Sequence, residues 1–528
     1  MSAIATPAAI TRHDREHAAA LRRLGGGCGA PSRAVGEAAN ITDLVDRTGT
    51  LIQGKPPRRV SPSHAADFVV RAIGQQFAYD SRAATWYRFA GTHWDATDAT
   101  IALNEHLMRY LYCVTDPLGF GPKYAKDILE VITTANSLPL PVTPEGAIPF
   151  ANGLLDIVSG DLIPTTPKNA LTWSLPYPYD PVARPDCPAI LAWLSQAVGG
   201  DAETVLMIRA IIAAILVGPA KYQKFLHLIG PGGTGKSTFL RLLTAMVGEP
   251  NIFSTDLQYL EKNRFETAAL RGKRLALISD SDKYGGSINV LKRLTGQDHV
   301  RYEKKYKQQE STFTFAGMII MASNESLRTT DHTSGLERRR ITVSFLKRFS
   351  NQERREFNAA GGEDRLKAEI PGMIAWALAM PVADVDRIIM SPPSRVATDN
   401  LTAMRNSNPV ADWLIENCVP DPASKLTLIG MSNKRSDRAT GQTYYADAEH
   451  HLFPNYLAHC LGVLTHPLGQ RNFTDALLDA LQNCLHVDVE RGRSKRGCGI
   501  KRIRLRAPDE PPYDWASRVT GDGDAEVF

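Results

Sequence analysis

The stretch LIGPGGTGKSTFLRLL, from Leu228 to Leu243, decides the fold of this chain. It passes from an apolar segment through a glycine-rich loop to Lys236 and Ser237, and then into a helix-like segment. The spacing matches G-x-x-x-x-G-K-[ST], a loop in which backbone N–H groups surround phosphates, the lysine neutralises charge and the hydroxyl holds Mg²⁺. A strand before it and a helix after it favour a true nucleotide loop over a chance match. Kinases, GTPases, transporters and packaging motors all carry such loops, so the rest of the chain must distinguish them.

The predicted nucleotide contacts all lie in this loop and in the turn that follows it. A helix from Ser237 to Val247 is expected to point its positive N-terminal end at the same phosphates. ATP and Mg²⁺ are therefore the expected ligands. The residues expected to bind them are Gly230, Gly232, Gly233, Thr234, Gly235, Lys236, Ser237 and Thr238.

The composition excludes several classes of protein. With 528 residues, 43% hydrophobic and 22% charged, the chain suffices for about three or four domains and is not disordered overall. The seven cysteines are scattered without a CxxC pair, which argues against a zinc ribbon and fits a reducing compartment. The longest apolar stretch, Val205–Gly218, is interrupted by Arg209 and is too short for a bilayer. Because the N-terminus also lacks an apolar signal core, we expect a cytosolic protein without a membrane partner.

Two carboxylates follow a later predicted strand. Leu275–Ile278 is apolar, and Asp280 and Asp282 come shortly after it. One carboxylate is expected to hold Mg²⁺ and the other to polarise the attacking water, and the sequence leaves open which does which. The alternative is a solvated acidic turn, but the spacing from Lys236 leaves room for a helix and another strand.

Polar and basic residues border the next two predicted strands. The run GMIIMAS leads to Asn324, which is placed to contact the γ-phosphate or the attacking water, or alternatively to cap a turn. The run SGLERRRITVSF carries Arg338 and Arg339 directly before an apolar strand. An arginine that reaches the γ-phosphate held by a neighbouring subunit accelerates hydrolysis by about 10³–10⁵-fold. The alternative is a solvated basic turn or a contact with a phosphate backbone.

A basic β-hairpin is predicted between the two carboxylates and Asn324, in the segment DHVRYEKKYKQQESTFTF. Its tip carries Lys304, Lys305, Tyr306 and Lys307. Lysines on a protruding loop contact phosphates, and a tyrosine ring stacks on bases. The alternative is a solvated charged turn.

A second basic block lies near the C-terminus. Residues 491–506, RGRSKRGCGIKRIRLR, hold eight basic residues and no acid. Two helix-like runs precede the block, an order that predicts a winged helix with a recognition helix near Phe473–Leu481. The wing is expected near Arg493–Arg496, and its DNA contacts would be Arg493, Lys495 and Arg496. A solvated hairpin is the alternative, because charge runs usually lie at the surface.

In order and spacing, these motifs resemble those of the superfamily 3 helicases of the AAA+ class. More narrowly, the chain resembles the helicase part of phage and plasmid primase–helicases, the group that includes the poxvirus-type enzymes. Four stretches carry the resemblance: GPGGTGKSTFL, LRGKRLALISDSD, LKRLTGQDHVRYEKKYK and MASNESLRTTDHTSGLERRRITVSF. The upstream stretch FANGLLDIVSGDLIP is similar to the region that precedes the helicase in that family.

The resemblance implies an α/β fold, with an AAA+ P-loop ATPase core built on a parallel sheet. An α+β pre-helicase domain would precede this core and a winged-helix domain would follow it. The implied domains are a flexible basic tail (1–60), the pre-helicase domain (61–185), a helical collar for oligomerisation (186–222), the superfamily 3 ATPase (223–395), the winged-helix-like domain (396–506) and an acidic tail (507–528).

The resemblance also implies residue roles. Proteins of this family form hexameric rings around single-stranded DNA and hold ATP between subunits. The implied roles are the first motif for Lys236 and Ser237, the metal ligands for Ser237 and Asp280, the acidic motif for Asp280 and Asp282, the sensor for Asn324, the arginine fingers for Arg338 and Arg339, and the DNA-tracking hairpin for Lys305 and Lys307. The family usually has Glu where Asp280 stands, so the choice of catalytic base between the two carboxylates is open.

The expected function is that of an ATP-dependent replicative DNA helicase of a phage, plasmid or integrated mobile element in the cytoplasm of a bacterial host. The expected partners are single-stranded or forked DNA, further copies of the chain in a homo-hexamer, and a separate primase or initiator. Alternatives are an origin-binding initiator that uses ATP as a switch, a primase–helicase with a degenerate primase, and a DNA-packaging motor. Primase activity is not expected, because residues 1–150 contain neither a zinc-ligand cluster nor a convincing pair of acids.

The basic hairpin generates the first prediction. Lys305→Ala should leave basal ATP hydrolysis largely intact and remove strand separation, because the lysine is expected to grip DNA rather than nucleotide. ATP turnover without DNA and displacement of a labelled strand from a forked duplex measure the two activities. Normal strand displacement by this variant would contradict the assignment of the hairpin.

Overall fold

The structure is a computed structural model, and it describes residues 61–115, 120–142, 146–182, 184–279, 284–302, 311–327, 329 and 333–520. The chain divides into two compact units. The first contains residues up to 145 together with residues 152–154 and 163–173, and the second contains the remainder. Each unit is described by itself.

The first unit combines helices with a small antiparallel sheet. Phe77, Trp86, Leu103 and Ile128 belong to its buried core. Trp86 and Trp94 are 8% and 2% exposed, so these aromatic side chains are core residues rather than platforms for bases. The elements are α3 (Pro62–Ile73), β1 (Phe77–Asp80), β2 (Thr85–Phe89), β3 (Trp94–Asp95), α4 (Ala99–Thr115) and α5 (Pro122–Thr134), with strand order β1-β2-β3.

A separate three-stranded sheet follows in the sequence, with strand order β4-β5-β6. Its strands are β4 (Ala147–Phe150), β5 (Gly153–Asp156) and β6 (Leu162–Ile163). Two of these strands, β5 and β6, lie in the stretch FANGLLDIVSGDLIP that resembles the region before the helicase.

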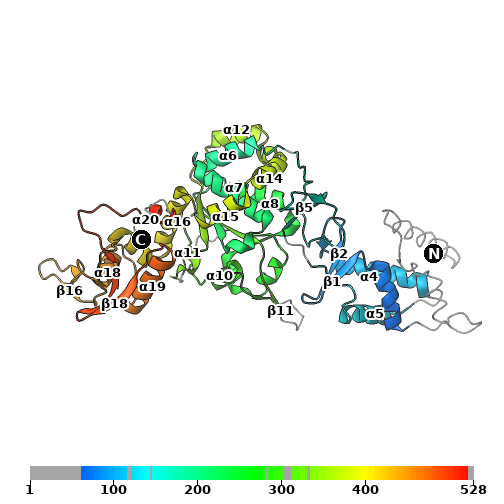
Figure 1. The fold of residues 1–528 in the computed structure, drawn as a ribbon, viewed down its shortest axis with the longest axis horizontal. Helices are drawn as coiled ribbons and strands as arrows, with labels where there is room; N and C mark the ends of the chain where they lie inside the picture. The colour runs from blue at the N-terminus through cyan, green and yellow to red at the C-terminus, as the bar shows by residue number, and fades with distance from the viewer. Residues whose placement is uncertain are drawn as a thin grey trace, which may run out of the picture. The chain divides into compact units, whose positions relative to one another are not determined.

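A five-stranded parallel sheet organises the second unit, as the sequence predicts (Figure 1). The strand order is β13-β7-β12-β9-β8, so β7 lies between two strands that come much later in the chain. The strands are β7 (Phe225–Ile229), β8 (Ile252–Asp256), β9 (Leu275–Ser279), β12 (Met318–Ser323) and β13 (Arg340–Ser344). All six residues of β12 are buried, which fits a strand covered on both faces.

Short helices connect these strands. They are α8 (Lys236–Val247), α9 (Leu257–Lys262), α10 (Asn289–Thr295) and α11 (Ser334–Glu337), with 3-10 turns η1 (Pro219–Tyr222), η2 (Glu249–Asn251) and η3 (Glu266–Leu270). A two-stranded antiparallel ribbon, β10 (Val300–Tyr302) and β11 (Ser311–Phe313), supplies the strands of the predicted basic hairpin. The predicted tip, with Lys304, Lys305, Tyr306 and Lys307, lies outside the described residues.

The segment predicted as an oligomerisation collar consists of α6 (Pro188–Ala197) and α7 (Ala202–Val217). Residues 207–216 of α7 are all buried apart from Arg209, which is partly buried, and α7 packs against α14 (Ile370–Leu378) and α15 (Val382–Met390). Arg209 donates to the Trp376 carbonyl at 2.9 Å and lies over its ring. Residues 207–216 are apolar apart from Arg209 because their own chain covers this part of the helix. The role of the segment in oligomerisation stays a prediction.

The edge strand β13 is covered by helix α16 (Ser394–Ser407). The backbone N–H of Thr342 donates to Asn400 Oδ1 at 2.6 Å, and that of Ser344 donates to Asp399 Oδ2 at 3.1 Å. These side chains satisfy donors that an open sheet edge would leave for another strand.

Two further helices precede α14, namely α12 (Asn351–Ala359) and α13 (Gly362–Ala368).

The C-terminal part of the second unit packs around Trp413, Tyr456 and Phe473. Trp515 is 2% exposed and belongs to the same core, so residues around it pack with the domain rather than extend from it as an acidic tail. The elements are α17 (Pro409–Asn417), β14 (Cys418–Pro420), β15 (Thr427–Leu428), β16 (Lys434–Ser436), β17 (Thr443–Tyr445), α18 (Leu452–Gly462), α19 (Gln470–Asn483), β18 (Glu490–Ser494), β19 (Gly497–Lys501), β20 (Ile503–Leu505) and α20 (Trp515–Thr520).

Within the described part of the chain, none of the helices combines the length and the apolar character that a membrane span requires.

Candidate nucleotide and nucleic-acid sites

The glycine-rich loop connects β7 to α8 at the carboxyl ends of the parallel strands. This edge is where ligands bind in open α/β sheets. Gly235 adopts φ +97°, and a Cβ atom there would lie 2.9 Å from Cζ2 of Trp193. At Gly230, an added Cβ would lie 2.2 Å from the Phe345 carbonyl oxygen. Both positions need glycine, because the loop passes closely between neighbouring elements.

Lys236 and Asn324 are brought together at this edge. The Lys236 ammonium donates to the carbonyl oxygens of Gly230 and Pro231, the latter at 3.0 Å, and to Asn324 Oδ1 at 3.3 Å. The contact follows from sheet order, because β7 and β12 pair in parallel from Phe225↔Ile319 to Ile229↔Ser323. The predicted phosphate lysine and the predicted sensor therefore share one site.

A cavity of about 750 Å³ opens over the loop. Its lining includes the predicted residues from Gly232 to Thr238 and Asn324, and it has an aromatic part with Trp193, Phe349 and Phe357. The rings were not predicted from sequence, because they come from α6 and from the segment after β13. The volume and the mixed lining suit a nucleotide, with cations and backbone N–H groups near the loop and rings for a base.

Glu369 fixes the start of the helix that carries Trp193. Its Oε2 accepts hydrogen bonds from the backbone N–H groups of Ala189 at 2.8 Å and Ile190 at 3.1 Å, at the first turn of α6. These are donors that a helix leaves unpaired at its N-terminus. The glutamate thus positions the aromatic wall of the cavity.

The helices after β13 close the other side of the cavity. Glu363 of α13 accepts from Thr238 Oγ1 at 3.1 Å and pairs with Arg241 of α8, which holds the pKa of this carboxyl below its usual value. Arg354 of α12 lies over the loop, where a Cβ on Gly233 would lie 2.1 Å from its Nη2 atom. Arg354 is thus a second cation at the phosphate end. The S-x-x-E capping box at Ser350 was the available signal for this helix.

Asp280 and Asp282, the predicted acidic motif, lie outside the described residues. Ser279, the residue before Asp280, is the end of β9 and lines the cavity. Ser237, the other predicted metal ligand, is exposed and lines the same cavity. An exposed hydroxyl beside a lysine fits a hydrated Mg²⁺ ion, which prefers oxygen ligands.

The three arginines before β13 have different surroundings. Arg340 is 2% exposed and forms an ion pair with Glu337. Arg339 is half-buried and donates to the Gly335 carbonyl at 2.8 Å, and burial lowers the pKa of its guanidinium. Arg338 is exposed, and its guanidinium makes no hydrogen bond or ion pair with any residue that the structure describes.

Arg338 lies at the opposite end of the sheet from the loop of its own chain. The N–H of Phe225, the first residue of β7, donates to the Arg339 carbonyl at 2.8 Å, and the loop follows the last residue of β7. Five residues of strand separate these ends by about 16 Å. Neither predicted arginine finger is therefore part of the cavity formed by its own chain.

The predicted recognition helix, α19, contacts the element that carries these arginines. Asp479 of α19 accepts hydrogen bonds from the backbone N–H and the hydroxyl of Ser334, the latter at 2.7 Å. Ser334 begins α11, which leads directly to Arg338. Asp479, Arg338 and Arg339 line one open groove of about 880 Å³. Asp479 of the predicted recognition helix is thus engaged within the chain.

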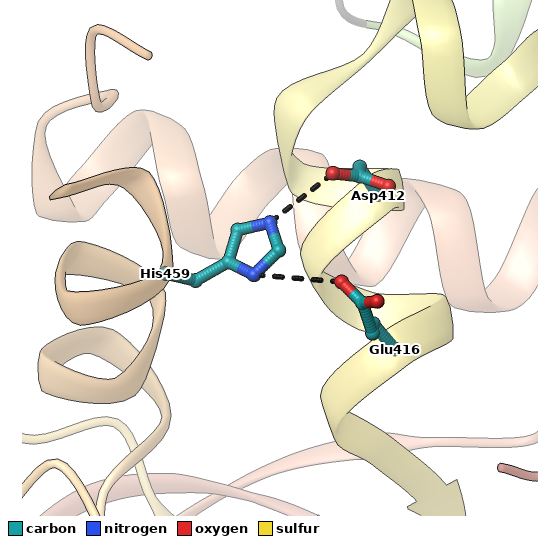
Figure 2. Close-up of side chains that lie close together, drawn as sticks. All are labelled: Asp412, Glu416 and His459. Atoms are coloured by element: carbon teal, nitrogen blue, oxygen red, sulfur yellow. Dashed lines mark hydrogen bonds and ion pairs between the residues drawn. The ribbon is translucent and has the colours of Figure 1, made fainter. Parts of the chain in front are cut away.

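Asp412, Glu416 and His459 form a second cluster of possible metal ligands (Figure 2). His459 Nε2 lies 3.1 Å from Asp412 Oδ2, while Nδ1 faces Glu416 at 3.8 Å. Arg405 lies 2.9 Å from Asp412 and 3.7 Å from Glu416. The carboxylates face different ring nitrogens and share an arginine, so we interpret the cluster as an ion-pair network that fastens α17 to α18.

Two family models match the chain. One is described as a family of unknown function (DUF5906) and matches residues 228–340, the interval from β7 through the loop and Asn324 to the arginines. The other is described as D5 N terminal like and matches residues 122–199. The second match overlaps the region for which the sequence resembles the pre-helicase part of primase–helicases. It supports a relationship to phage-type primase–helicases.

Two relatives from Marchantia polymorpha match parts of the chain. The "uncharacterized mitochondrial protein ymf20" is 28% identical over 151 residues, which cover 27% of this chain and 87% of the relative. The "uncharacterized mitochondrial protein ymf21" is 30% identical over 120 residues, which cover 21% of this chain and 67% of the relative. The chain belongs to the same family as ymf21. Neither name states an activity.

Solved structures with similar arrangements include two of the NrS-1 C terminal region. The A form apo structure has a TM-score of 0.42 and 13% identity, and covers 63% of this chain and 74% of that chain. The A form of residues 305–718 has a TM-score of 0.39 and 11% identity, and covers 84% of this chain and 100% of that chain. Scores at this level do not establish a common fold.

The ion-pair network predicts a pH-dependent contribution to stability. The hydrogen bond from His459, followed by that from Arg405, lowers the pKa of Asp412 in the folded protein. A lowered pKa means that the carboxylate stabilises the fold above its ordinary pKa of about 4, and that this contribution is lost as the pH falls through the folded-state pKa. Asp412→Asn should therefore reduce the free energy of unfolding by about 1–2 kcal/mol at neutral pH.

Denaturant unfolding of the wild type and the variant between about pH 3 and pH 7 measures this difference. The difference in the free energy of unfolding between wild type and variant should become smaller as the pH is lowered. Asp384→Asn is the control, since Asp384 pairs with Arg387 at an exposed helix surface. A gap that stays constant over this range would contradict the network.

Proposed function

We propose that this chain is an ATP-dependent replicative DNA helicase with a superfamily 3 AAA+ core. The observation that carries the proposal is the contact between Lys236 and Asn324 at the mouth of the cavity, with Arg338 exposed at the far end of the same sheet. Such a chain holds a nucleotide at the carboxyl ends of its parallel strands and presents an arginine at their amino ends. Adjacent copies would then form complete sites between them.

The nucleotide would be held by groups of one chain. Backbone N–H groups of the loop and the start of α8 would surround the phosphates, with Lys236 and Arg354 supplying positive charge. Trp193 and Phe349 would stack on the base. A magnesium ion would neutralise phosphate charge, and Ser237 together with Asp280 is the expected set of ligands.

The arginine would act in the neighbouring copy. Arg338 is the better candidate of the predicted pair, because its guanidinium is exposed while that of Arg339 is half-buried and bonded to its own helix. Asp479 would act as a positioning residue by holding the start of α11, one helical turn before Arg338. In this arrangement, the C-terminal domain helps to set the geometry of the intersubunit site.

DNA would be gripped by the lysine tips on β10 and β11 and by the C-terminal domain. The order α17, β15, α18, α19, β18, β19, with sheet order β15-β19-β18, supports a winged helix. Its wing would be the turn between β18 and β19, with Arg493, Lys495 and Arg496 exposed. The relationship to phage-type primase–helicases supports a role in replication.

Mixing two inactive variants tests the proposal. Lys236→Ala should abolish ATP turnover while leaving the fold intact, and Arg338→Ala should lower turnover by about 10³-fold. Mixed oligomers should regain turnover. The Lys236→Ala chain still has Arg338, and the Arg338→Ala chain still has an intact loop, so the two together form complete sites. Steady-state ATP hydrolysis at varied mixing ratios, together with strand displacement by the wild type, provides the measurement. Absence of any regain would contradict a site shared between copies.

Asp479→Ala should lower ATP turnover by roughly tenfold, the equivalent of one hydrogen bond to a charged group. Mixing with Lys236→Ala should restore turnover, because Asp479→Ala disturbs Arg338, which acts in the neighbouring copy, and leaves the loop of its own chain intact. Asp475→Ala is the matched control, because Asp475 lies one turn earlier on α19 and pairs with Arg491. If mixing does not restore the lost turnover, Asp479 acts in the nucleotide site of its own chain and not in the shared site.

A further inference from the structure

The C-terminal domain carries a second cationic hairpin that the sequence motifs did not single out. β16 and β17 pair in antiparallel fashion from Lys434↔Tyr445 to Ser436↔Thr443. All residues from 431 to 440 are exposed, including Lys434, Arg435 and Arg438. Tyr444 of the facing strand is 47% exposed and lies opposite Arg435. The hairpin therefore presents cations and a ring to solvent.

The turn of this hairpin is well formed. Asp437 Oδ1 accepts hydrogen bonds from the backbone N–H groups of Ala439 at 2.7 Å and Thr440 at 3.1 Å. The base of the hairpin is closed by the Ala446 N–H, which donates to the Asn433 carbonyl at 2.9 Å. The one carboxylate near the tip is thus used to hold the turn, as Asp side chains commonly do. The cations are presented on an ordered support.

The two cationic hairpins extend from the same end of one sheet. β15 pairs with β19 as Thr427↔Ile500 and Leu428↔Gly499, and the Ile429 N–H then donates to the Cys498 carbonyl at 2.9 Å. The chain thus leaves β15 beside the turn between β18 and β19 and continues into the second hairpin. Figure 1 places the labels of β16 and β18 together at this end of the domain.

Pairing of charges distinguishes these tips from several other cations of the domain. Arg405, Lys501, Arg502 and Arg504 each contact a carboxylate of their own chain. Within the described residues, no carboxylate lies within ion-pair distance of the cations at the two tips, which are Lys434, Arg435, Arg438, Arg493, Lys495 and Arg496. Like charges gathered without partners repel one another, and binding a polyanion relieves that repulsion.

We propose that the β16–β17 hairpin is a nucleic-acid contact that acts beside the β18–β19 turn, with Lys434, Arg435 and Arg438 on phosphates and Tyr444 against a base or sugar. Nucleic acid fits better than a small anion, because two separate tips match repeating charge along a chain. The inference rests on the proposed function in taking DNA as the polymer. It places the C-terminal DNA surface at the two tips rather than on α19, whose Asp479 is engaged with Ser334.

The test measures DNA binding of the full chain by fluorescence anisotropy over a series of salt concentrations. The variant Lys434→Ala/Arg435→Ala/Arg438→Ala is compared with Lys221→Ala/Lys367→Ala/Arg387→Ala, which removes the same charge from paired positions outside the C-terminal domain. The hairpin variant should bind at least about tenfold more weakly at low salt. Its log–log salt slope should fall by about 2–3, at roughly 0.9 per duplex phosphate contact or 0.7 per single-strand contact.

Separate single-stranded, duplex and forked DNAs identify which form the hairpin contacts. Basal ATP turnover and the unfolding curve should match the wild type, because all three side chains are exposed. If the wild type binds and unwinds DNA but the hairpin variant matches the control, the inference is overturned and the proposed function stands. If the wild type binds none of the DNAs, the proposed function fails and the inference fails with it.

Discussion

The parallel pairing of β7 with β12 on one side and β13 on the other is the constraint on which the rest of the structure depends. The pairing with β12 places Asn324 against Lys236, and the pairing with β13 places the Phe345 carbonyl against Gly230. The same registers put Arg338 beside the start of β7. One sheet therefore carries the glycine-rich loop at one end of its strands and Arg338 at the other. A one-residue shift of the β12 pairing would displace Asn324, and a shift of the β13 pairing would displace Arg338.

Burial within the chain explains why several helices are strongly apolar or carry isolated charges. Arg274 is partly buried and donates to the carbonyl oxygens of Ile215 and Leu216, at the end of α7, at 2.8 and 3.0 Å, and burial lowers its pKa to about 10. Glu369 serves the start of α6 in the same way. These contacts satisfy helix ends that would otherwise be buried without partners. The contact of Glu369 holds α6, which lines the cavity over the loop.

The parallel sheet and the loop could be predicted from the sequence, because β7, β9 and β12 are short apolar runs and the last two are followed directly by a polar residue. The aromatic wall could not, since Trp193 and Phe349 come from segments distant in sequence that only the fold brings together. The packing of α7 against α14 and α15 could not be predicted either, because periodicity alone does not tell which partner covers an apolar helix. The hairpin of Lys434 was not singled out, because a short charged turn has no distinctive spacing.

Strand β13 connects Arg338 to the end of the sheet that carries the glycine-rich loop, and its hydrogen bonds fix its length. At the far end, the Phe345 N–H donates to the Ile229 carbonyl at 2.7 Å, immediately before the loop. A hydrogen-bonded strand does not stretch, so β13 keeps its two ends about 16 Å apart. If copies of the chain assemble as proposed, β13 would keep Arg338 at a fixed separation from the loop of its own chain, so a movement of the arginine in one shared site would be transmitted to the loop in the next.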